Sequence, residues 1–329
     1  MDIASGAMKA PGFLITTIFV IIGLSLMSSC AHKEPPAESV LKPEVQAAVQ
    51  PVIMTTSGLN LINETQARGY VEDLIVSKGL DRVRAHDLMN DPRMVFNEKF
   101  VLKNLNFVRP AASAKSPGRM EFDNKYVIKG RAFIAENQNL FDVIRQKYEI
   151  SPEIIMAILI VETRIGTYPM RYQPFNVYAN ISLISDPAIM ERLKGFTGVD
   201  NIPLHDAEGM KKTLARGRWA AGELYNLILI ADTLGLDPLE IMGSVGGALG
   251  PAQFIPSTFM KWGADGDDDG VRNPFSMPDA IASIANLIKK SGWRENGDEK
   301  KNRNAIWLYN HSDVYVNTIM KLYEELSKA

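Results

Sequence analysis

The sequence is poor in the side chains that carry thiol and zinc chemistry. Among its 329 residues there is one cysteine, Cys30, and the four histidines are scattered at positions 32, 86, 205 and 311. A zinc centre needs several such ligands close together, and a thiol enzyme needs a cysteine with a histidine partner. The composition therefore argues against both kinds of active site.

An excess of charge of one sign is also missing, because 36 basic and 38 acidic residues leave a net charge of −2. Proteins that bind nucleic acid usually concentrate positive charge on one face, so we expect no nucleic acid partner. In addition, no run of six residues alternates clearly between apolar and polar side chains, as a half-buried strand would. Apolar residues recur instead at helical spacing, and we predict a mainly α fold.

The N-terminus has the pattern of an export signal. Lys9 precedes an uncharged apolar stretch, Gly12–Met27, which is short for a membrane-spanning helix and suits the hydrophobic region of a signal peptide. Asp2 stands where positive charge is usual, so translation from Met8 would produce a more ordinary signal. Two serines and Cys30 follow at once, and this arrangement resembles a bacterial lipoprotein signal.

That resemblance implies cleavage before Cys30 and lipidation of its sulfur; the alternative is an uncleaved anchor. Ala31 after the cysteine resembles lipoproteins sorted to the outer membrane, so we expect a lipid-anchored protein on the periplasmic face of that membrane. We divide the chain into a signal peptide (1–30), a flexible tether interrupted by prolines (31–57) and a folded helical region (58–329).

The folded region is organised around residues 148–166, YEISPEIIMAILIVETRIG, where eight apolar residues precede Glu162. We predict a buried helix with Ser151 as its N-cap that ends near the closing glycine. A carboxyl group in apolar surroundings loses solvation, so its pKa rises and it keeps a proton near neutral pH, as a general acid must. The alternative is a structural ion pair between Glu162 and Arg164 or another base.

Two further stretches have two interpretations each, and a third has no assigned role. The glycine-rich segment 243–262 contains Gln253, which offers both a donor and an acceptor, and Ser257, which can cap a helix; the segment is either a flexible loop or a substrate-contacting turn. The tyrosine-rich stretch 168–178 could line a groove or cover the core. Residues 185–210 are expected to form an irregular insertion of unknown role.

Residues 265–270, DGDDDG, have the spacing of an EF-hand calcium loop. Positions 1, 3 and 5 are aspartates, position 6 is a glycine and position 7 offers a carbonyl: Asp265, Asp267, Asp269, Gly270 and Val271. Ser276 replaces the glutamate expected at position 12, although Asp279 could close a lengthened loop. On spacing alone, a calcium site and a plain acidic turn both remain open.

Four motifs follow one another between residues 148 and 316. They are E-T-x-x-G around Glu162, G-A-x-G-x-x-Q-F-x-P-S-[ST] at 247–258, an EF-hand-like loop followed by D-A-I-x-S-x-A-N at 279–286, and Y-N-x-S-x-x-Y-V at 309–316. In this order they resemble the membrane-bound lytic murein transglycosylases of the B type. One motif would be a weak signal, whereas four in order are specific.

The resemblance implies a lysozyme-like fold with an inserted EF-hand-like calcium loop, and no organic cofactor. It implies that the partner is peptidoglycan, cleaved at the β-1,4 bond between N-acetylmuramic acid and N-acetylglucosamine. Carried over residue by residue, the catalytic acid/base falls on Glu162, and the structural calcium ligands are Asp265, Asp267, Asp269, Val271 and Asp279. The saccharide-binding residues implied are Ser244, Gln253, Tyr309, Asn310 and Tyr315.

The sequence departs from the family pattern in two places. Leu287 stands where the family usually has a tyrosine, so one sugar contact is in doubt. The stretch 185–210 is longer than the family pattern leads us to expect, and it lies between motifs that must converge.

The resemblance also implies chemistry with one carboxyl group, whereas most glycosidases use two. Glu162 would protonate the glycosidic oxygen while the sugar's N-acetyl group stabilises the developing cation. The Glu162 carboxylate would then take the proton of the muramic C6 hydroxyl, closing a 1,6-anhydro ring without water. The alternatives are a lysozyme-type hydrolase with the same acid and a non-catalytic peptidoglycan-binding lipoprotein.

Overall fold

The computed structural model describes residues 61–106, 122–194 and 206–328. Within these ranges the chain forms thirteen α-helices, one 3₁₀ helix and two isolated β-bridges, so the mainly α prediction is confirmed. None of the helices in these ranges is long and apolar enough to cross a membrane. The predicted signal peptide, Cys30 and the tether lie outside the described residues.

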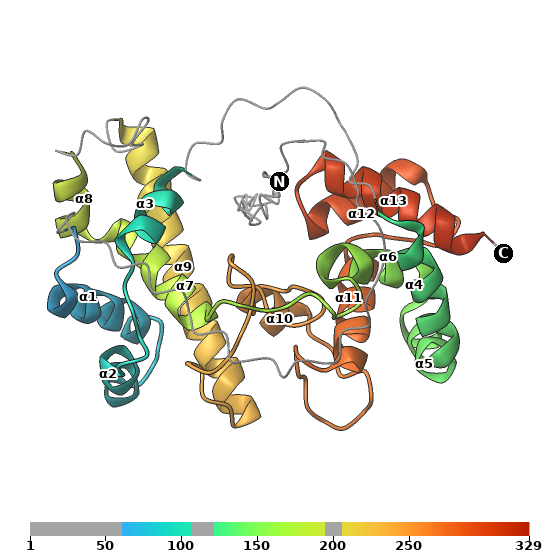
Figure 1. Ribbon diagram of the computed structural model, residues 1–329, viewed down its shortest axis with the longest axis horizontal. Coiled ribbons are helices and arrows are strands. Elements are labelled where there is room, and N and C mark those ends of the chain that lie inside the picture. The colour runs from blue at the N-terminus through green and yellow to red at the C-terminus, as the bar shows by residue number, and fades with distance from the viewer. Residues whose placement is uncertain (1–60, 107–121, 195–205, 329) are drawn as a thin grey trace, which may run out of the picture.

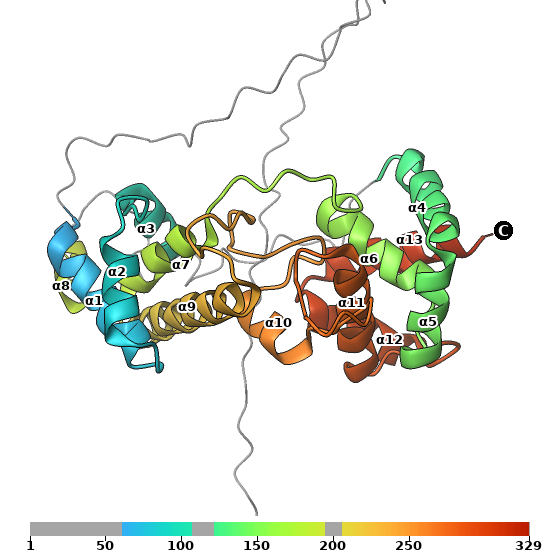
Figure 2. The same cartoon turned by 90° about the horizontal axis from the view of Figure 1, so that it is seen from below.

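Figure 1 shows the helices in two groups, and Figure 2 shows the same division from below. The first group contains α1 (Glu64–Val76), α2 (Arg82–Asn90), α3 (Glu98–Asn106), α7 (Pro174–Ser182), η1 (Leu183–Ser185), α8 (Pro187–Lys194) and α9 (Ala207–Leu234). The second contains α4 (Asn124–Glu136), α5 (Gln138–Tyr148), α6 (Pro152–Thr163), α11 (Met277–Lys290), α12 (Glu299–Tyr309) and α13 (Asp313–Ser327). Helix α10 (Pro256–Trp262) lies between them and contacts α9 and α11.

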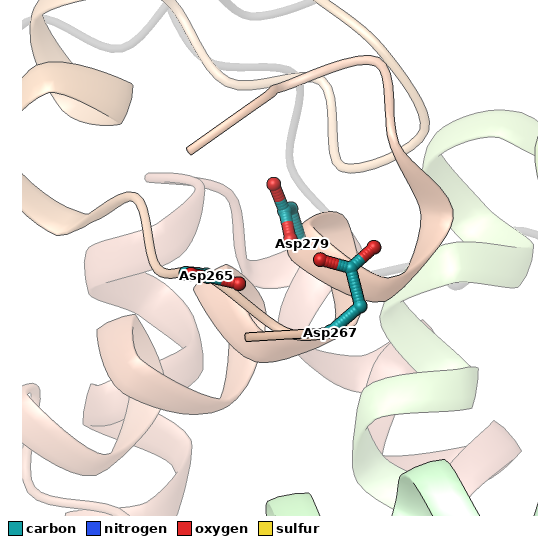
Figure 3. Close-up of side chains that lie close together, drawn as sticks. All are labelled: Asp265, Asp267 and Asp279. Carbon is teal, nitrogen blue, oxygen red and sulfur yellow. The ribbon is translucent and has the colours of Figure 1, made fainter. Parts of the chain in front are cut away.

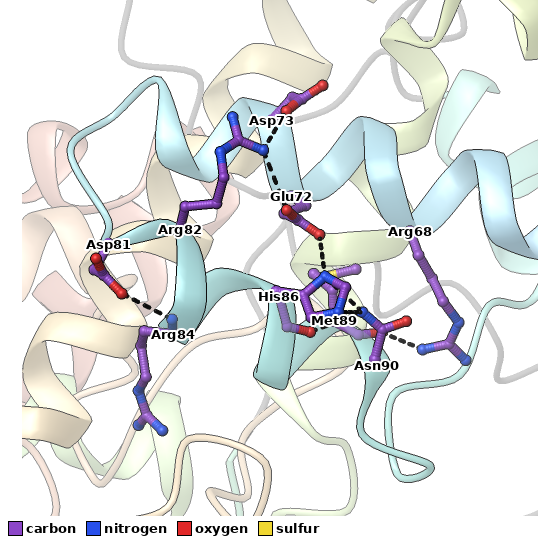
Figure 4. A network of polar contacts seen from close by, with 9 residues as sticks. All are labelled: Arg68, Glu72, Asp73, Asp81, Arg82, Arg84, His86, Met89 and Asn90. Carbon is purple, nitrogen blue, oxygen red and sulfur yellow. Dashed lines mark hydrogen bonds and ion pairs between the residues drawn. The ribbon is translucent and has the colours of Figure 1, made fainter.

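The first group is built on α9, the longest helix, against which α1, α7 and α10 pack. A surface network joins α1 to α2, with Arg82 paired to Glu72 and Asp73 at 3.2 and 3.0 Å and His86 3.1 Å from Glu72 (Figure 4). Exposed pairs of this kind contribute little to stability. The two helices, which contact each other, are therefore held together mainly by buried apolar side chains: Val71, Ile75, Ala85, Leu88 and Met89.

The second group is built on α6, the helix predicted from the apolar run. Every residue from Ile154 to Ile160 is fully buried, as expected for a helix with apolar side chains on all faces. Gly130 of α4 permits the close packing, because a Cβ there would lie 2.9 Å from Met156 and 3.1 Å from Leu326 of α13. The second group thus encloses α6, whose partly exposed residues are Glu153 in the first turn and Val161 and Glu162 at the C-terminal end.

The structure corrects three local expectations. Ser151 occupies the N-cap position of α6, but its side chain makes no capping hydrogen bond. Ser257 is not an N-cap: α10 starts at Pro256, and the hydroxyl of Ser257 bonds to Glu223 instead. A cap can be predicted from residue type, but whether the side chain turns back on its helix depends on the neighbours that compete for it.

The third correction concerns residues 185–210, which were expected to be irregular. Helix α8 and the first turn of α9 are regular within this stretch, while 195–205 lie outside the described residues. The tyrosine-rich stretch covers the core through Phe175 and Tyr178, which are fully buried, whereas Tyr168 and Tyr172 are about half exposed. The groove-lining role considered for the stretch stays a prediction.

Candidate active site

A pocket opens where the C-terminal ends of α6 and α12 meet the segment 243–258. It is lined by Glu162, Ser244, Gly246, Ala248, Gln253, Phe254, Ile255, Thr258, Leu287, Tyr309 and Asn310. Five of the six residues assigned to acid and saccharide contacts from the sequence therefore share one pocket, although they come from three separate parts of the chain. The sixth, Tyr315, is buried and contacts Glu162 directly.

Glu162 supplies a carboxyl group to this pocket. Burial raises the pKa of its carboxyl group to about 7, while a hydrogen bond from the hydroxyl of Tyr315 to Oε1, 2.7 Å long, acts in the opposite direction. A carboxyl group with such a pKa can release a proton and take it back near neutral pH, which is what an acid/base catalyst requires.

The ion pair considered as the alternative for Glu162 is absent from the described residues. No lysine, arginine or histidine there lies within ion-pair distance of its carboxylate. Arg164 instead places its guanidinium 5.8 Å from the ring centre of Tyr126 and 5.7 Å from that of Tyr168. The raised pKa of Glu162 is consistent with the lack of a cationic partner.

Tyr309 and Tyr315 form the wall beside the acid. Their rings are stacked, with centroids 6.1 Å apart and planes 9° from parallel. The hydroxyl of Tyr309 donates to the carbonyl of Ala252 at 2.6 Å. Burial, together with the charge of Glu162, raises the pKa of both phenols, so both stay neutral and act as hydrogen-bond donors.

The turn that carries Gln253 has an unusual backbone. Gly250 and Gln253 both have positive φ angles, 60° and 51°, and a Cβ on Gly250 would lie 1.8 Å from the carbonyl oxygen of Pro274. Glycine is therefore required at position 250. The side-chain nitrogen Nε2 of Gln253 donates to the Gly250 carbonyl at 2.9 Å, so this side chain folds back over its own turn. Gln253 also lines the pocket.

The remaining pocket residues include both apolar and polar side chains. Leu287, which stands where the family pattern has tyrosine, is 5% exposed and lines the same pocket as Glu162. Oδ1 of Asn310 is buried and has no hydrogen-bond partner among the described residues. Ser244 uses its hydroxyl to accept a bond from the amide of Ala248 at 3.1 Å, which stabilises the local turn.

Some residues important to the pocket were not singled out from the sequence. Thr163, fully buried, donates from its hydroxyl to the carbonyl of Pro251 at 2.9 Å, and Thr258 lines the pocket. Glu223 of α9 is buried and accepts bonds from both the backbone and the hydroxyl of Ser257. The motif letters already include both threonines, but the sequence does not reveal which carbonyl a hydroxyl reaches.

The acidic loop brings three carboxylates together (Figure 3). Oxygens of Asp265, Asp267 and Asp279 lie within 4.8 Å of one another. Gly270 adopts a φ of 87°, as the sharp turn at position 6 needs. Asp269 does not belong to this group; its Oδ1 accepts a bond from the amide of Val271 at 2.7 Å.

The donor set fits a hard divalent cation such as calcium. Three carboxylates supply the oxygen ligands that calcium prefers, and Oδ1 of Asp265 is buried without a hydrogen-bond partner among the described residues. Burial raises the pKa of Asp279, and the charges of Asp267 and Asp265 add to the effect, whereas backbone hydrogen bonds oppose it. A bound cation would relieve this mutual repulsion.

The profile of the family described as "Transglycosylase SLT domain" matches residues 118–300, which is more than half of the chain. The chain belongs to this transglycosylase family. The matched residues include Glu162, the turn with Gln253 and the acidic loop, and they end before Tyr309.

The chain is also similar to characterised proteins of the same kind. It is 25% identical over 283 residues to "Membrane-bound lytic murein transglycosylase B" of Escherichia coli, covering 82% of this chain and 70% of the relative. E. coli lytic transglycosylase Slt35 in complex with calcium superposes with a TM-score of 0.60 at 20% identity, covering 82% of this chain and 94% of the other. SltB3 from Pseudomonas aeruginosa in complex with NAG-NAM-pentapeptide superposes with a TM-score of 0.60 at 16% identity, covering 81% of this chain and 80% of the other.

These similarities confirm the resemblance predicted from the four motifs. The fold is the lysozyme-like fold of the lytic transglycosylases, as expected.

Proposed function

We propose that this chain is a peptidoglycan lytic transglycosylase in which Glu162 is the single acid/base. The observation that carries the proposal is one carboxyl group with a pKa near 7 in a pocket, with a neutral tyrosine donor on its Oε1. Family membership supports the reaction class. Among the described residues no second carboxylate lines this pocket, so a mechanism with two carboxylates has no second participant.

In the first step Glu162 transfers its proton to the glycosidic oxygen between N-acetylmuramic acid and N-acetylglucosamine. The bond from that oxygen to the muramic C1 breaks, and the substrate's own N-acetyl group stabilises the positive charge at C1. The hydrogen bond from Tyr315 stabilises the carboxylate that Glu162 becomes.

In the second step the Glu162 carboxylate removes the proton from the muramic C6 hydroxyl. The C6 oxygen then bonds to C1, and the product is a 1,6-anhydro ring formed without water. Because both reacting groups belong to one sugar, the ring closure is intramolecular, and holding it in the reactive geometry lowers its entropic cost.

Polar pocket groups would orient the sugars. Asn310 has a buried Oδ1 that can accept a bond from a saccharide hydroxyl or amide. Ser244 and Gln253 present polar atoms at the same pocket. Leu287, where a tyrosine would add a hydroxyl, contributes an apolar surface instead.

The test of the reaction is the digestion of purified peptidoglycan with mass analysis of the released muropeptides. We expect 1,6-anhydromuramic ends, each lighter by one water molecule than a hydrolysed end. Reducing muramic ends would instead identify a lysozyme-type hydrolase, and no cleavage would favour a non-catalytic wall-binding protein.

The acidic loop would hold a structural calcium ion. This assignment is supported by three carboxylates whose oxygens lie within 4.8 Å of one another, those of Asp265, Asp267 and Asp279. Asp269 and the carbonyl of Val271 are the remaining expected ligands; Asp269 would have to exchange its bond to the Val271 amide for the ion. The ion would fix the loop that leads into α11, and the proposed chemistry needs no metal.

The protein would be anchored in the bacterial envelope through a lipid on Cys30, with residues 31–57 as a tether and 58–329 as the catalytic region. The lipoprotein-like signal supports this arrangement. The E. coli relative is named as membrane-bound, which is consistent with it.

A further inference from the structure

The glycine-rich segment 243–258 is held to both helix groups by side chains that bond its backbone. On the side of the first group, the Tyr178 hydroxyl donates to the carbonyl of Gly247 at 3.0 Å. Glu223 accepts the amide of Ser257 at 2.8 Å. On the side of the second group, Thr163 and Tyr309 donate to the adjacent carbonyls of Pro251 and Ala252.

Thr163 occupies a special position among these anchors because it directly follows Glu162. It is fully buried, and its hydroxyl both donates to Pro251 and accepts the amide of Gly166 at 2.9 Å. Its carbonyl accepts the amide of Tyr168 at 2.8 Å. One residue thus joins the end of α6, the turn that follows it and the turn that carries Gln253.

The backbone that Thr163 supports is strained on both sides. After α6 the φ angles of Arg164, Ile165 and Gly166 are 52°, 61° and 74°, and a β-branched residue such as isoleucine is rarely found in this region. In the opposite turn Gln253 has a φ of 51°. Such conformations persist only where surrounding contacts hold them.

We propose that Thr163 is a positioning residue that sets the distance between the acid Glu162 and the substrate-contacting turn at Gln253. The inference rests on the proposed function, because it assigns both Glu162 and Gln253 to the reaction. Removing the Thr163 hydroxyl leaves the carbonyl of Pro251 without this donor and allows the turn to move relative to α6. We expect the pKa of Glu162 to stay as it is in the wild type, since it depends on burial and on Tyr315.

The experiment compares Thr163→Val, which keeps the shape but lacks the hydroxyl, with Thr163→Ser, which restores it. The matched control is Thr213→Val: Thr213 is equally buried, but its hydroxyl bonds within its own helix, to Gly209 of α9. The measurements are kcat, KM and the pH dependence of kcat on solubilised glycan strands, and the Kd for a tetramer of N-acetylglucosamine.

For Thr163→Val we expect KM and Kd to rise about tenfold, because the turn that contacts the sugars is then held less firmly and only part of the molecules present it in the binding conformation. We expect kcat at saturation to stay within about threefold and its pH midpoint to stay near that of the wild type. Thr163→Ser and Thr213→Val should both keep the wild-type KM and Kd. If Thr163→Val does not fold, Thr163→Cys, a weaker donor, should give a KM between those of the wild type and a tenfold increase.

A folded Thr163→Val or Thr163→Cys variant with unchanged KM and Kd, or with only a lower melting temperature, would overturn the inference. An equal rise of KM and Kd in Thr213→Val would also overturn the inference, since the effect would then not depend on the bond between Thr163 and Pro251. Failure of the proposed function looks different: the wild type would release no anhydromuramic ends, whatever Thr163 does to the Kd.

Discussion

The hydroxyl of Tyr315 donates a hydrogen bond to Oε1 of Glu162 at 2.7 Å, although the two residues are 153 positions apart in the sequence. Burial favours the neutral acid, and this bond favours its anion. The balance leaves the pKa of Glu162 at about 7. One carboxyl group can then serve as the acid in the first step and as the base in the second.

The pH dependence of cleavage should follow from this balance. The first step needs protonated Glu162, so kcat/KM should fall as the pH rises through about 7. Tyr315→Phe removes the bond that lowers the pKa, so the falling limb should move to higher pH. The control is Tyr323→Phe, whose hydroxyl bonds Glu295 away from the pocket and should not shift the profile. An unshifted limb in Tyr315→Phe would mean that Glu162 does not control it.

Glu162→Gln separates chemistry from packing, because it keeps the shape and removes the proton. Cleavage should fall by about 10²–10⁴-fold, the usual contribution of a placed acid/base, while binding of glycan fragments persists. Glu153→Gln, at the other end of α6, is the matched control and should retain full activity. Undiminished cleavage by a well-folded Glu162→Gln protein would show that another residue is the acid.

Glu162→Gln should also raise the free energy of unfolding at neutral and higher pH. A carboxyl group whose pKa rises from 4.5 to about 7 on folding binds its proton more tightly when folded, so stability is full below pH 4.5 and falls as the pH rises through 7. At pH 8 the folded protein then carries a cost of up to about 3 kcal/mol that glutamine lacks. Urea unfolding of both proteins at pH 4 and pH 8 measures this; equal stability at pH 8 would argue against the raised pKa.

Calcium should raise the melting temperature. A ligand that binds only the folded state stabilises it by about 2.7 kcal/mol at a hundredfold excess over Kd. Asp265→Asn with Asp267→Asn should abolish the shift, whereas Asp87→Asn, an exposed residue of α2, should preserve it. Identical melting curves with calcium and with chelator would contradict a calcium site in the acidic loop.

Lipidation predicts that the full chain incorporates labelled fatty acid and fractionates with the outer membrane. Cys30→Ala removes the only sulfhydryl, so both properties should be lost, while Ser29→Ala should retain them. Labelling that survives Cys30→Ala would place the lipid elsewhere and reject the lipoprotein signal.

Local sequence patterns were enough to predict two features of the fold. An uninterrupted apolar run predicted α6 and its burial, because a helix apolar on all faces must lie inside the protein. That Glu162 at its end is the catalytic acid stays a prediction. The aspartate spacing predicted an acidic loop with Asp265, Asp267 and Asp269 at positions 1, 3 and 5 and Asp279 as a candidate to close it; in the structure Asp265, Asp267 and Asp279 come together and Asp269 does not join them. In both cases the residues that carry the pattern lie within one helix or one loop.

The hydrogen-bond partners that are distant in the sequence depend on how the helices pack. Nothing in the sequence near Glu162 predicted that it would have no ion pair within the described ranges and accept a bond from Tyr315, or that Thr163 would reach Pro251. Ser257 has the residue type of a cap, but the buried Glu223 of another helix takes its hydroxyl. Partners of this kind are chosen by packing, since a buried polar group bonds whatever the fold brings within reach, however far away it is in the chain.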